Sequence, residues 1–356
     1  MPQAFSIVVS IAAILMIGNL LILAHELGHY IAARSVGLVA EQFTIGFGPD
    51  LFRVTDRRGT LWSLSALPLG GFVSFAGEHD RSCQGGYAAL PLPARLAIIA
   101  AGPAANILVA IGLFAGILAT KGETTLLPVA SVVVPGSAAD TAGLQVGDRV
   151  LAVDGTRVTT FSELVPLLRG HPDQVVELQI DRDDAVIGVS ARLGVRAAGG
   201  KFVGYLGIVS HALGHRPLTL GQIALYAPAR AWHITVETLS GIATAVTTGQ
   251  GVGHFAGMLG VAHIAGEAAA TGTTQLVALT AILSINLALM NLLPIPVLDG
   301  GAFLFCLVEW VRGQPAPERV RDLATRTGAA AIAGLFALST LHDLAGFGLF
   351  QWLAGL

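Results

Sequence analysis

The sequence predicts a multi-pass α-helical membrane protein with four transmembrane helices, a membrane-associated β-ribbon and an inserted α/β domain. Hydrophobic residues make up 53% of the 356 residues and charged residues only 12%, whereas charged residues are about a quarter of an ordinary soluble domain. Four apolar runs are long enough to cross a bilayer, which needs about 20 residues. Between the second and third runs, alternating apolar residues separated by turn residues predict the inserted domain.

The apolar runs divide the chain into consecutive segments. We place the spans at about 4–33, 94–119, 276–297 and 324–341, the third with a helical continuation. The predicted segments are a first transmembrane helix at 1–36, a cytoplasmic or re-entrant β-ribbon at 37–93, a second transmembrane helix at 94–120, an outer α/β domain at 125–208, interfacial amphipathic helices at 209–274, a third transmembrane helix at 275–310, and a fourth transmembrane helix with an interfacial tail around Trp352 at 318–356.

A charged motif, HELGH at residues 25–29, lies at the end of the first apolar run. On a helix, His25 and His29 share a face, so both imidazoles can bind one metal ion while Glu26 acts on a bound water. This spacing is typical of a zinc hydrolase. Charged groups inside a membrane are costly and are functional by default. The alternatives are a chance match, a structural zinc site or a satisfied polar cluster.

The segment from Glu41 to Phe75 is predicted to form a β-ribbon. Apolar residues with strand patterning flank the turn sequence Asp56-Arg57-Arg58-Gly59. The apolar content indicates that the ribbon enters the membrane, where its backbone must be covered by protein or face a wet cavity. A free strand edge there is a candidate site for an extended substrate.

The insert is predicted to be a small α/β domain. Residues 134–155 follow the order strand, short helix, Gly-Asp turn, strand and Asp-Gly turn, and residues 161–168 supply a helix. Residues 175–180 and 186–193 then form a hairpin. This order resembles a PDZ domain of the permuted bacterial kind. Such a domain either adds a peptide strand to its groove or acts only as a steric filter.

The stretch from Leu218 to Thr248 is apolar enough to suggest a fifth span. We favour an interfacial amphipathic helix, because Arg230, His233 and Glu237 interrupt the apolar run and Pro228 breaks it. With four spans, positions late in the first and third spans lie near the same side of the membrane. With five, they would lie on opposite sides.

A second polar cluster, NLLPIPVLDGG at 291–301, ends the third apolar run. Two histidines leave a catalytic zinc one protein ligand short, and an aspartate in an apolar run is a natural oxygen donor. We therefore predict Asp299 as the third ligand. Asp299 also suits a helix that restarts after two prolines, as its cap, and this role is compatible with ligation.

Arginines in the short loops predict the orientation of the chain. They lie between the first and second spans and between the third and fourth spans. Because basic loops stay in the cytoplasm, we expect both termini and the insert on the outer side. The zinc site is then expected near the cytoplasmic side.

Four motifs occur in a specific order: HELGH at 25–29, PLGGFV at 68–73, GPAAN at 102–106 and NLLPIPVLDGG at 291–301. Together they resemble the bacterial site-2 proteases, a family of intramembrane zinc metalloproteases, in the subgroup with a single PDZ domain. The resemblance covers nearly the whole chain. It implies a Zn²⁺ cofactor held by His25, His29 and Asp299, with Glu26 as the catalytic base.

The resemblance also implies substrates and a location. The family acts in the bacterial inner membrane on single-span membrane proteins such as anti-sigma factors, often after another protease has trimmed them, and on signal-peptide remnants. Asn286 and Asn291 are carried over as candidates to hold the substrate backbone, and Asn106 is a weaker candidate. The alternative role of Asn286 and Asn291 is a hydrogen bond between helices. Asn106 is expected to bond across helices near the site, with helix packing at Gly102 as its alternative.

Other function classes fit the sequence less well. A pseudoprotease scaffold would not need the intact ligand set, and a metal transporter would need further acidic or histidine residues along a path. The net charge of −3 argues against a nucleic-acid partner. The two cysteines, Cys83 and Cys306, form no disulfide framework, and His263 and Glu267 are expected to be a solvated helix pair.

Overall fold

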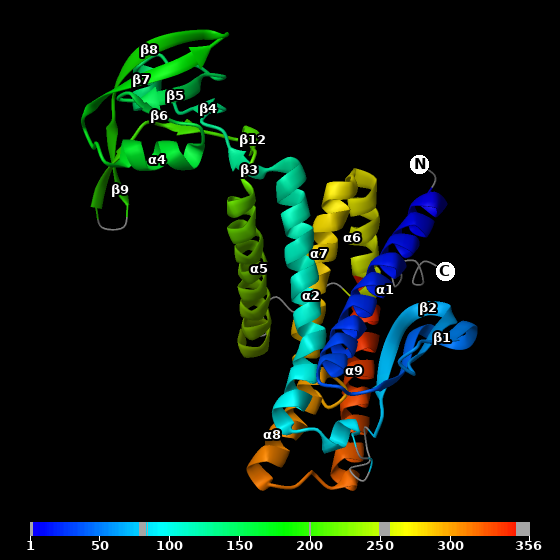
Figure 1. Cartoon of the computed structure of the whole chain (residues 1–356). Helices are drawn as coiled ribbons and strands as arrows, with labels where there is room; N and C mark the ends of the chain where they lie inside the picture. The colour runs from blue at the N-terminus through cyan, green and yellow to red at the C-terminus, as the bar shows by residue number, and fades with distance from the viewer. Residues whose placement is uncertain (1–2, 78–82, 84, 199–200, 249–256, 347–356) are drawn as a thin grey trace. The chain divides into compact units, whose positions relative to one another are not determined.

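The computed structural model describes residues 3–77, 83, 85–198, 201–248 and 257–346 (Figure 1). The predicted tail around Trp352 lies outside the described residues. The chain divides into two compact units. The first comprises residues 1–117 and 221–356, and the second, residues 118–220, is inserted into it in the sequence.

Long helices build the first unit. They are α1 (Gln3–Ser35), α2 (Leu92–Lys121), α5 (Leu220–Thr248), α6 (Met258–Thr271), α7 (Thr273–Asn291), α8 (Asp299–Arg312) and α9 (Glu318–Gly346). A short 3-10 turn, η1 (Tyr87–Ala89), precedes α2. Among the described residues, four helices are long and apolar enough to cross a membrane, namely α1, α2, α7 and α9. These are the four helices in which the sequence places its spans.

The third predicted segment, 275–310, is made of two helices with a break between them. Helix α7 ends at Asn291 and α8 begins at Asp299. Pro294 and Pro296 explain the break, since proline lacks a backbone N–H and disfavours helical backbone in the residue before it. The break gives Asp299 a position in the first turn of a new helix.

The region predicted as interfacial helices also differs from expectation. Pro228 does not end α5, which is one helix of 29 residues with the proline inside it. An interior proline removes one hydrogen bond and crowds the carbonyl four residues earlier, and it can kink a helix without ending it. Thr238 on α5 donates a hydrogen bond to Asn286 on α7 over 3.3 Å. Helix α6 packs against α1, α7 and α9 and therefore belongs to the helix bundle (Figure 1). An interfacial position for α5 stays a prediction.

The β-ribbon forms where the sequence predicts it. Strand β1 (Ala40–Thr55) pairs antiparallel with β2 (Leu61–Phe75), and both contact α1 (Figure 1). Phe43 is fully buried, stacks on Trp62 with ring centroids 4.6 Å apart and lies edge-on to Tyr30. These aromatic contacts fix the ribbon to α1 one residue beyond His29.

The second unit contains the predicted helices and hairpin. Its helices are α3 (Ala138–Thr141) and α4 (Phe161–Arg169), and its strands are β3 (Glu123–Leu126), β4 (Val132–Val133), β5 (Arg149–Val153), β6 (Thr156–Arg157), β7 (Val175–Arg182), β8 (Ala185–Arg192), β9 (Gly194–Ala198), β10 (Lys201–Tyr205), β11 (Ile208–Val209) and β12 (Leu213–Arg216). Strands β6, β5, β7 and β8 form a four-stranded sheet in that order. Thr160 and Glu163 form a capping box that starts α4. Leu164, Leu178 and Ile180 are fully buried in the core of this unit.

A buried ion pair in the second unit predicts a pH effect on its stability. Asp148 is 1% exposed and accepts hydrogen bonds of 2.7 and 2.6 Å from Arg182. The hydrogen bonds from Arg182 hold the pKa of Asp148 below its usual range despite its burial. Because the pKa is lowered on folding, the stabilisation is complete above the unfolded-state pKa of about 4 and is lost as the pH falls through the folded-state pKa.

We expect Asp148→Asn to lower the free energy of unfolding of this unit by about 2 kcal/mol at pH 7 and to weaken its acid sensitivity. Hydrogen–deuterium exchange of the β5 and β7 amides in the full chain measures both effects. Asp173→Asn is the matched control, because its ion pair with Arg192 is exposed on both sides. Equal effects of the two substitutions would contradict the prediction.

Candidate metal centre

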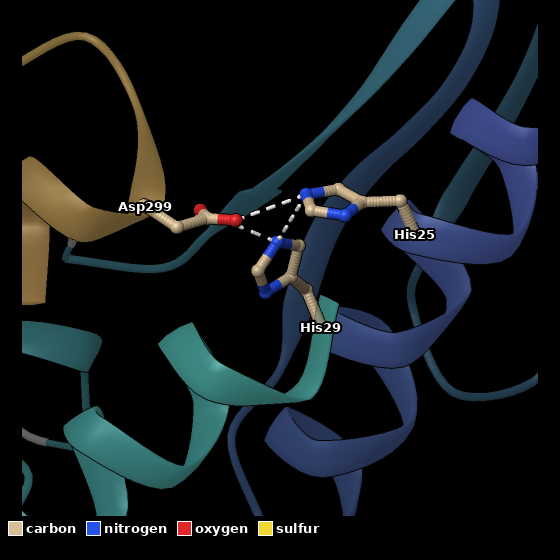
Figure 2. Close-up of side chains that lie close together, drawn as sticks. All are labelled: His25, His29 and Asp299. Atoms are coloured by element: carbon tan, nitrogen blue, oxygen red, sulfur yellow. Dashed lines mark hydrogen bonds and ion pairs between the residues drawn. The ribbon is translucent and has the colours of Figure 1, made fainter. Parts of the chain in front are cut away.

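Two histidines of α1 converge on one point. His25 and His29 are four residues apart on the helix, and both side chains are buried. Their Nε2 atoms lie 3.1 Å apart, and the rings meet nearly at a right angle, 85° (Figure 2). Both histidines thus direct the same ring nitrogen to a common position, as the spacing of the motif predicts.

Asp299 completes the cluster from a distant part of the chain. It is the first residue of α8, and its Oδ2 lies 3.0 Å from His25 Nε2 while its Oδ1 lies 3.4 Å from His29 Nε2 (Figure 2). Oδ2 is buried, and although it lies close to His25 Nε2, no described residue donates a hydrogen bond to it in acceptable geometry. In the part of the chain that the structure describes, this is the one group of three or more His, Cys, Asp or Glu side chains close enough to hold a metal ion.

The donor atoms fit a tetrahedral zinc ion. Zinc binds histidine nitrogen and carboxylate oxygen at about 2.0–2.2 Å, so two ligand atoms of a tetrahedral site lie about 3.3 Å apart. The separations in the cluster run from 3.0 to 3.4 Å. Two histidines and one carboxylate are also a donor set of catalytic zinc sites, which use three protein ligands.

Glu26 lies beside the cluster and contacts the β-ribbon. Its Oε2 accepts a hydrogen bond of 3.0 Å from the backbone N–H of Val73 on β2. Glu26 and the three clustered side chains line a cavity of about 460 Å³ together with ribbon residues that include Phe72 and Val73. The cavity therefore brings a carboxylate, a candidate metal position and a strand edge together.

The three asparagines of the predicted set lie in different surroundings. Asn291 lines the cavity, and its Nδ2 lies 3.5 Å from His25 Nε2. Asn286 instead accepts the hydrogen bond from Thr238 of α5. Asn106 is fully buried on the far side of the His25 ring and is not among the residues that line the cavity. Of the three, Asn291 is the one that lines the cavity, and a substrate-binding role for the asparagines stays a prediction.

The helix face that supports the two histidines was not predicted from the sequence. His29 Nδ1 lies 2.8 Å from the backbone oxygen of Ile98 on α2. A Cβ atom on Gly102 would lie 2.3 Å from His29 Nε2, and one on Gly28 would lie 2.3 Å from the backbone oxygen of Ala101. The two glycines therefore allow α1 and α2 to approach closely at the cluster. The signal in the sequence was the helical spacing of Ile98, Gly102 and Asn106.

A buried ion pair, also missed, links the same helix to α8. Arg95 on α2 donates hydrogen bonds of 3.0 and 2.6 Å to the two carboxylate oxygens of Glu309. Both side chains are largely buried. Since α8 begins with Asp299, this pair ties the helix of the third clustered residue to the helix that supports the other two.

This chain is similar to proteins that are named as zinc metalloproteases. Residues 12–335 match the model of peptidase family M50. A protein of Rhizobium meliloti named "Putative zinc metalloprotease" is 32% identical over 97% of this chain and 97% of its own length. One of the same name from Agrobacterium fabrum is 32% identical over 94% of this chain and 95% of its own length.

The chain belongs to peptidase family M50. It is therefore a peptidase, and the family together with the four helices that are long and apolar enough to cross a membrane indicates an integral membrane protein. Among solved structures, the PDZ domain of an SdrC-like protein from Listeria innocua is 19% identical and covers 26% of this chain and 99% of its own length, with a TM-score of 0.21.

Proposed function

We propose that this member of peptidase family M50 is an intramembrane zinc metalloprotease that cleaves transmembrane segments of membrane proteins. The observation that carries the proposal is the convergence of His25, His29 and Asp299 within 4.8 Å of one another, on helices of an apolar bundle. Glu26 stands beside them on the same cavity. The names of the relatives support zinc as the metal.

The residues of the chain divide the chemistry between them. When bound, zinc lowers the pKa of water and polarises the carbonyl of the scissile peptide bond. Glu26 takes a proton from the attacking water and delivers it to the leaving amine. The N–H of Val73 holds one oxygen of that carboxylate, so the other oxygen is left for the proton transfer.

The substrate is a transmembrane segment presented in extended form. A peptide bond in a membrane helix is protected because its backbone is hydrogen-bonded within the helix. The segment must therefore unwind, and we propose that the edge of β2 and the amide of Asn291 hold its backbone beside the cavity. Single-span membrane proteins already trimmed by another protease, such as anti-sigma factors, and signal-peptide remnants are substrates of this form.

Metal content tests the proposal directly. We expect the purified protein to contain about one zinc ion per chain and to cleave a single-span model substrate. The double variant His25→Ala/His29→Ala is expected to lose both the zinc and the cleavage, because it removes two of three ligands. A full zinc complement in the double variant, measured by elemental analysis, would contradict the proposed zinc site.

Cysteine labelling tests the orientation. We propose that the protein lies in the bacterial inner membrane with both termini and the domain at 125–208 on the outer side, because the basic loops between the first and second spans and between the third and fourth spans stay in the cytoplasm. A membrane-impermeant maleimide is expected to reach Cys83 only from the cytoplasmic side and an Asp183→Cys variant only from the outer side. The variant Cys83→Ser is the control for labelling at positions other than Cys83. Modification of both positions from one side would contradict the four-span topology.

A further inference from the structure

We propose that Asn106 is a positioning residue for His25. Its side-chain oxygen accepts a hydrogen bond from the Nδ1–H of His25 and thereby fixes the imidazole with Nε2 directed at the metal. This role rests on the proposed zinc site, and it differs from substrate binding.

The burial of Asn106 requires a partner for its amide. The side chain is fully buried in α2, an apolar helix. The backbone oxygen of Asn106 is already engaged by the hydroxyl of Ser284 on α7, which donates over 2.7 Å. The side-chain Oδ1, however, has no hydrogen-bond partner among the described residues. A buried polar atom without a partner is costly, so its role has to be sought in its surroundings.

The neighbour of this amide is the ring of His25. Asn106 Nδ2 lies 3.4 Å from His25 Nδ1. His25 Nε2 points to His29 and Asp299, so a metal there uses the lone pair of Nε2 and Nδ1 carries the hydrogen. Two donors then face each other. The oxygen and nitrogen of a side-chain amide have nearly the same shape and are assigned from their hydrogen bonds. A rotation of the Asn106 amide group by about 180° exchanges the two atoms and places Oδ1 against the Nδ1–H of His25.

The second histidine has the matching arrangement. His29 Nδ1 lies 2.8 Å from the backbone oxygen of Ile98, an atom that only accepts. Ile98, Gly102 and Asn106 are spaced four residues apart and therefore lie on one face of α2. That face therefore supplies an acceptor to each histidine, a carbonyl to His29 and an amide oxygen to His25. Gly102, between them, leaves room for the rings.

The position of Asn106 separates this role from substrate binding. Asn106 is fully buried and does not line the cavity, whereas Asn291 does. A residue that acts only through His25 changes the affinity for the metal and leaves the affinity for substrate unaltered. Conserved outer hydrogen bonds of this kind contribute about 10- to 100-fold to metal affinity.

The test uses a pair of variants in the full-length, detergent-solubilised protein. Asn106→Leu keeps the approximate size of the side chain and removes the acceptor, and Asn106→Asp keeps an oxygen acceptor at the same place. We expect Asn106→Leu to raise the Kd for zinc about 10- to 100-fold in competition with a chelator, and Asn106→Asp to restore most of the affinity. The absorption spectrum of the cobalt(II)-loaded protein is expected to change in Asn106→Leu, and KM of the remaining activity is expected to stay constant.

Each outcome decides the role. Wild-type zinc affinity in Asn106→Leu would overturn it, and so would equal losses in both variants, because the residue would then act by packing and not as an acceptor. Asn286→Leu is the matched control, since this asparagine contacts Thr238 and not a histidine, and its zinc affinity is expected to be unchanged. If the proposed function itself were wrong, the wild-type protein would bind no zinc, which is distinguishable from a loss of zinc affinity in Asn106→Leu alone.

Discussion

Glu26→Gln is expected to lower the rate of peptide cleavage by at least about 100-fold while the protein keeps its zinc. The amide has nearly the same size and still accepts the hydrogen bond from the N–H of Val73, so the cavity and the three ligands stay in place. It does not take up a proton, and general acid–base catalysis contributes about 10²- to 10⁴-fold. Cleavage of a single-span model substrate and elemental analysis on the same preparation measure both quantities.

The control for this substitution is Glu237→Gln. Glu237 is exposed on α5, where it pairs with His233 one turn away, so its loss is expected to change neither activity nor zinc content. Cleavage by Glu26→Gln at the wild-type rate would show that another group handles the proton. Loss of zinc in Glu26→Gln would show instead that Glu26 is needed for metal binding.

The parts of the site that the sequence predicted depend on local spacing. His25 and His29 meet because a helix places fourth neighbours on one face, and this follows from HELGH alone. Asp299 was reached by counting ligands, and the structure brings it to the same point. The β-ribbon and the hairpin of the second unit were predicted from turn residues and apolar patterning.

The parts that the sequence did not predict depend on contacts between distant segments. The ion pair of Arg95 and Glu309 joins positions 214 residues apart. From the sequence, the arginines near the spans were interpreted only as a signal of orientation in the membrane. The hydrogen bond from the backbone N–H of Val73 to Glu26 could be predicted only if the position of the ribbon against α1 were known. Pro228 was overrated as a helix breaker: an interior proline can kink a helix without ending it, and α5 continues through Pro228 over 29 residues.

These distant contacts link the parts of the catalytic apparatus through α1 and α2. Helix α1 carries two clustered histidines and Glu26, and it anchors the ribbon through Tyr30. Helix α2 supports both histidines and holds α8 through Arg95. The geometry of the site therefore depends on how closely the two helices approach, and glycine sets that distance.

Gly102→Ala is accordingly expected to abolish the site with one added methyl group. Its Cβ would lie 2.3 Å from His29 Nε2, 2.5 Å from His29 Cε1 and 2.8 Å from His25 Cε1, distances that no carbon atom tolerates. The imidazole of His29 is held by the oxygen of Ile98 and cannot move aside without losing that bond and its place in the cluster. We expect a loss of at least about 100-fold in zinc affinity and in cleavage, since a displacement of about 1 Å at a catalytic group has effects of this size.

Gly112→Ala provides the matched control for this prediction. Gly112 is in the same helix, and a Cβ there meets nothing within 4 Å, so the substitution improves helix propensity by about 1 kcal/mol and is expected to leave zinc binding and cleavage unchanged. Zinc titration, cleavage of the model substrate and circular dichroism of both variants separate damage to the site from damage to the fold. Normal zinc affinity in Gly102→Ala would mean that α1 and α2 lie farther apart at the cluster than the geometry of the two histidines requires.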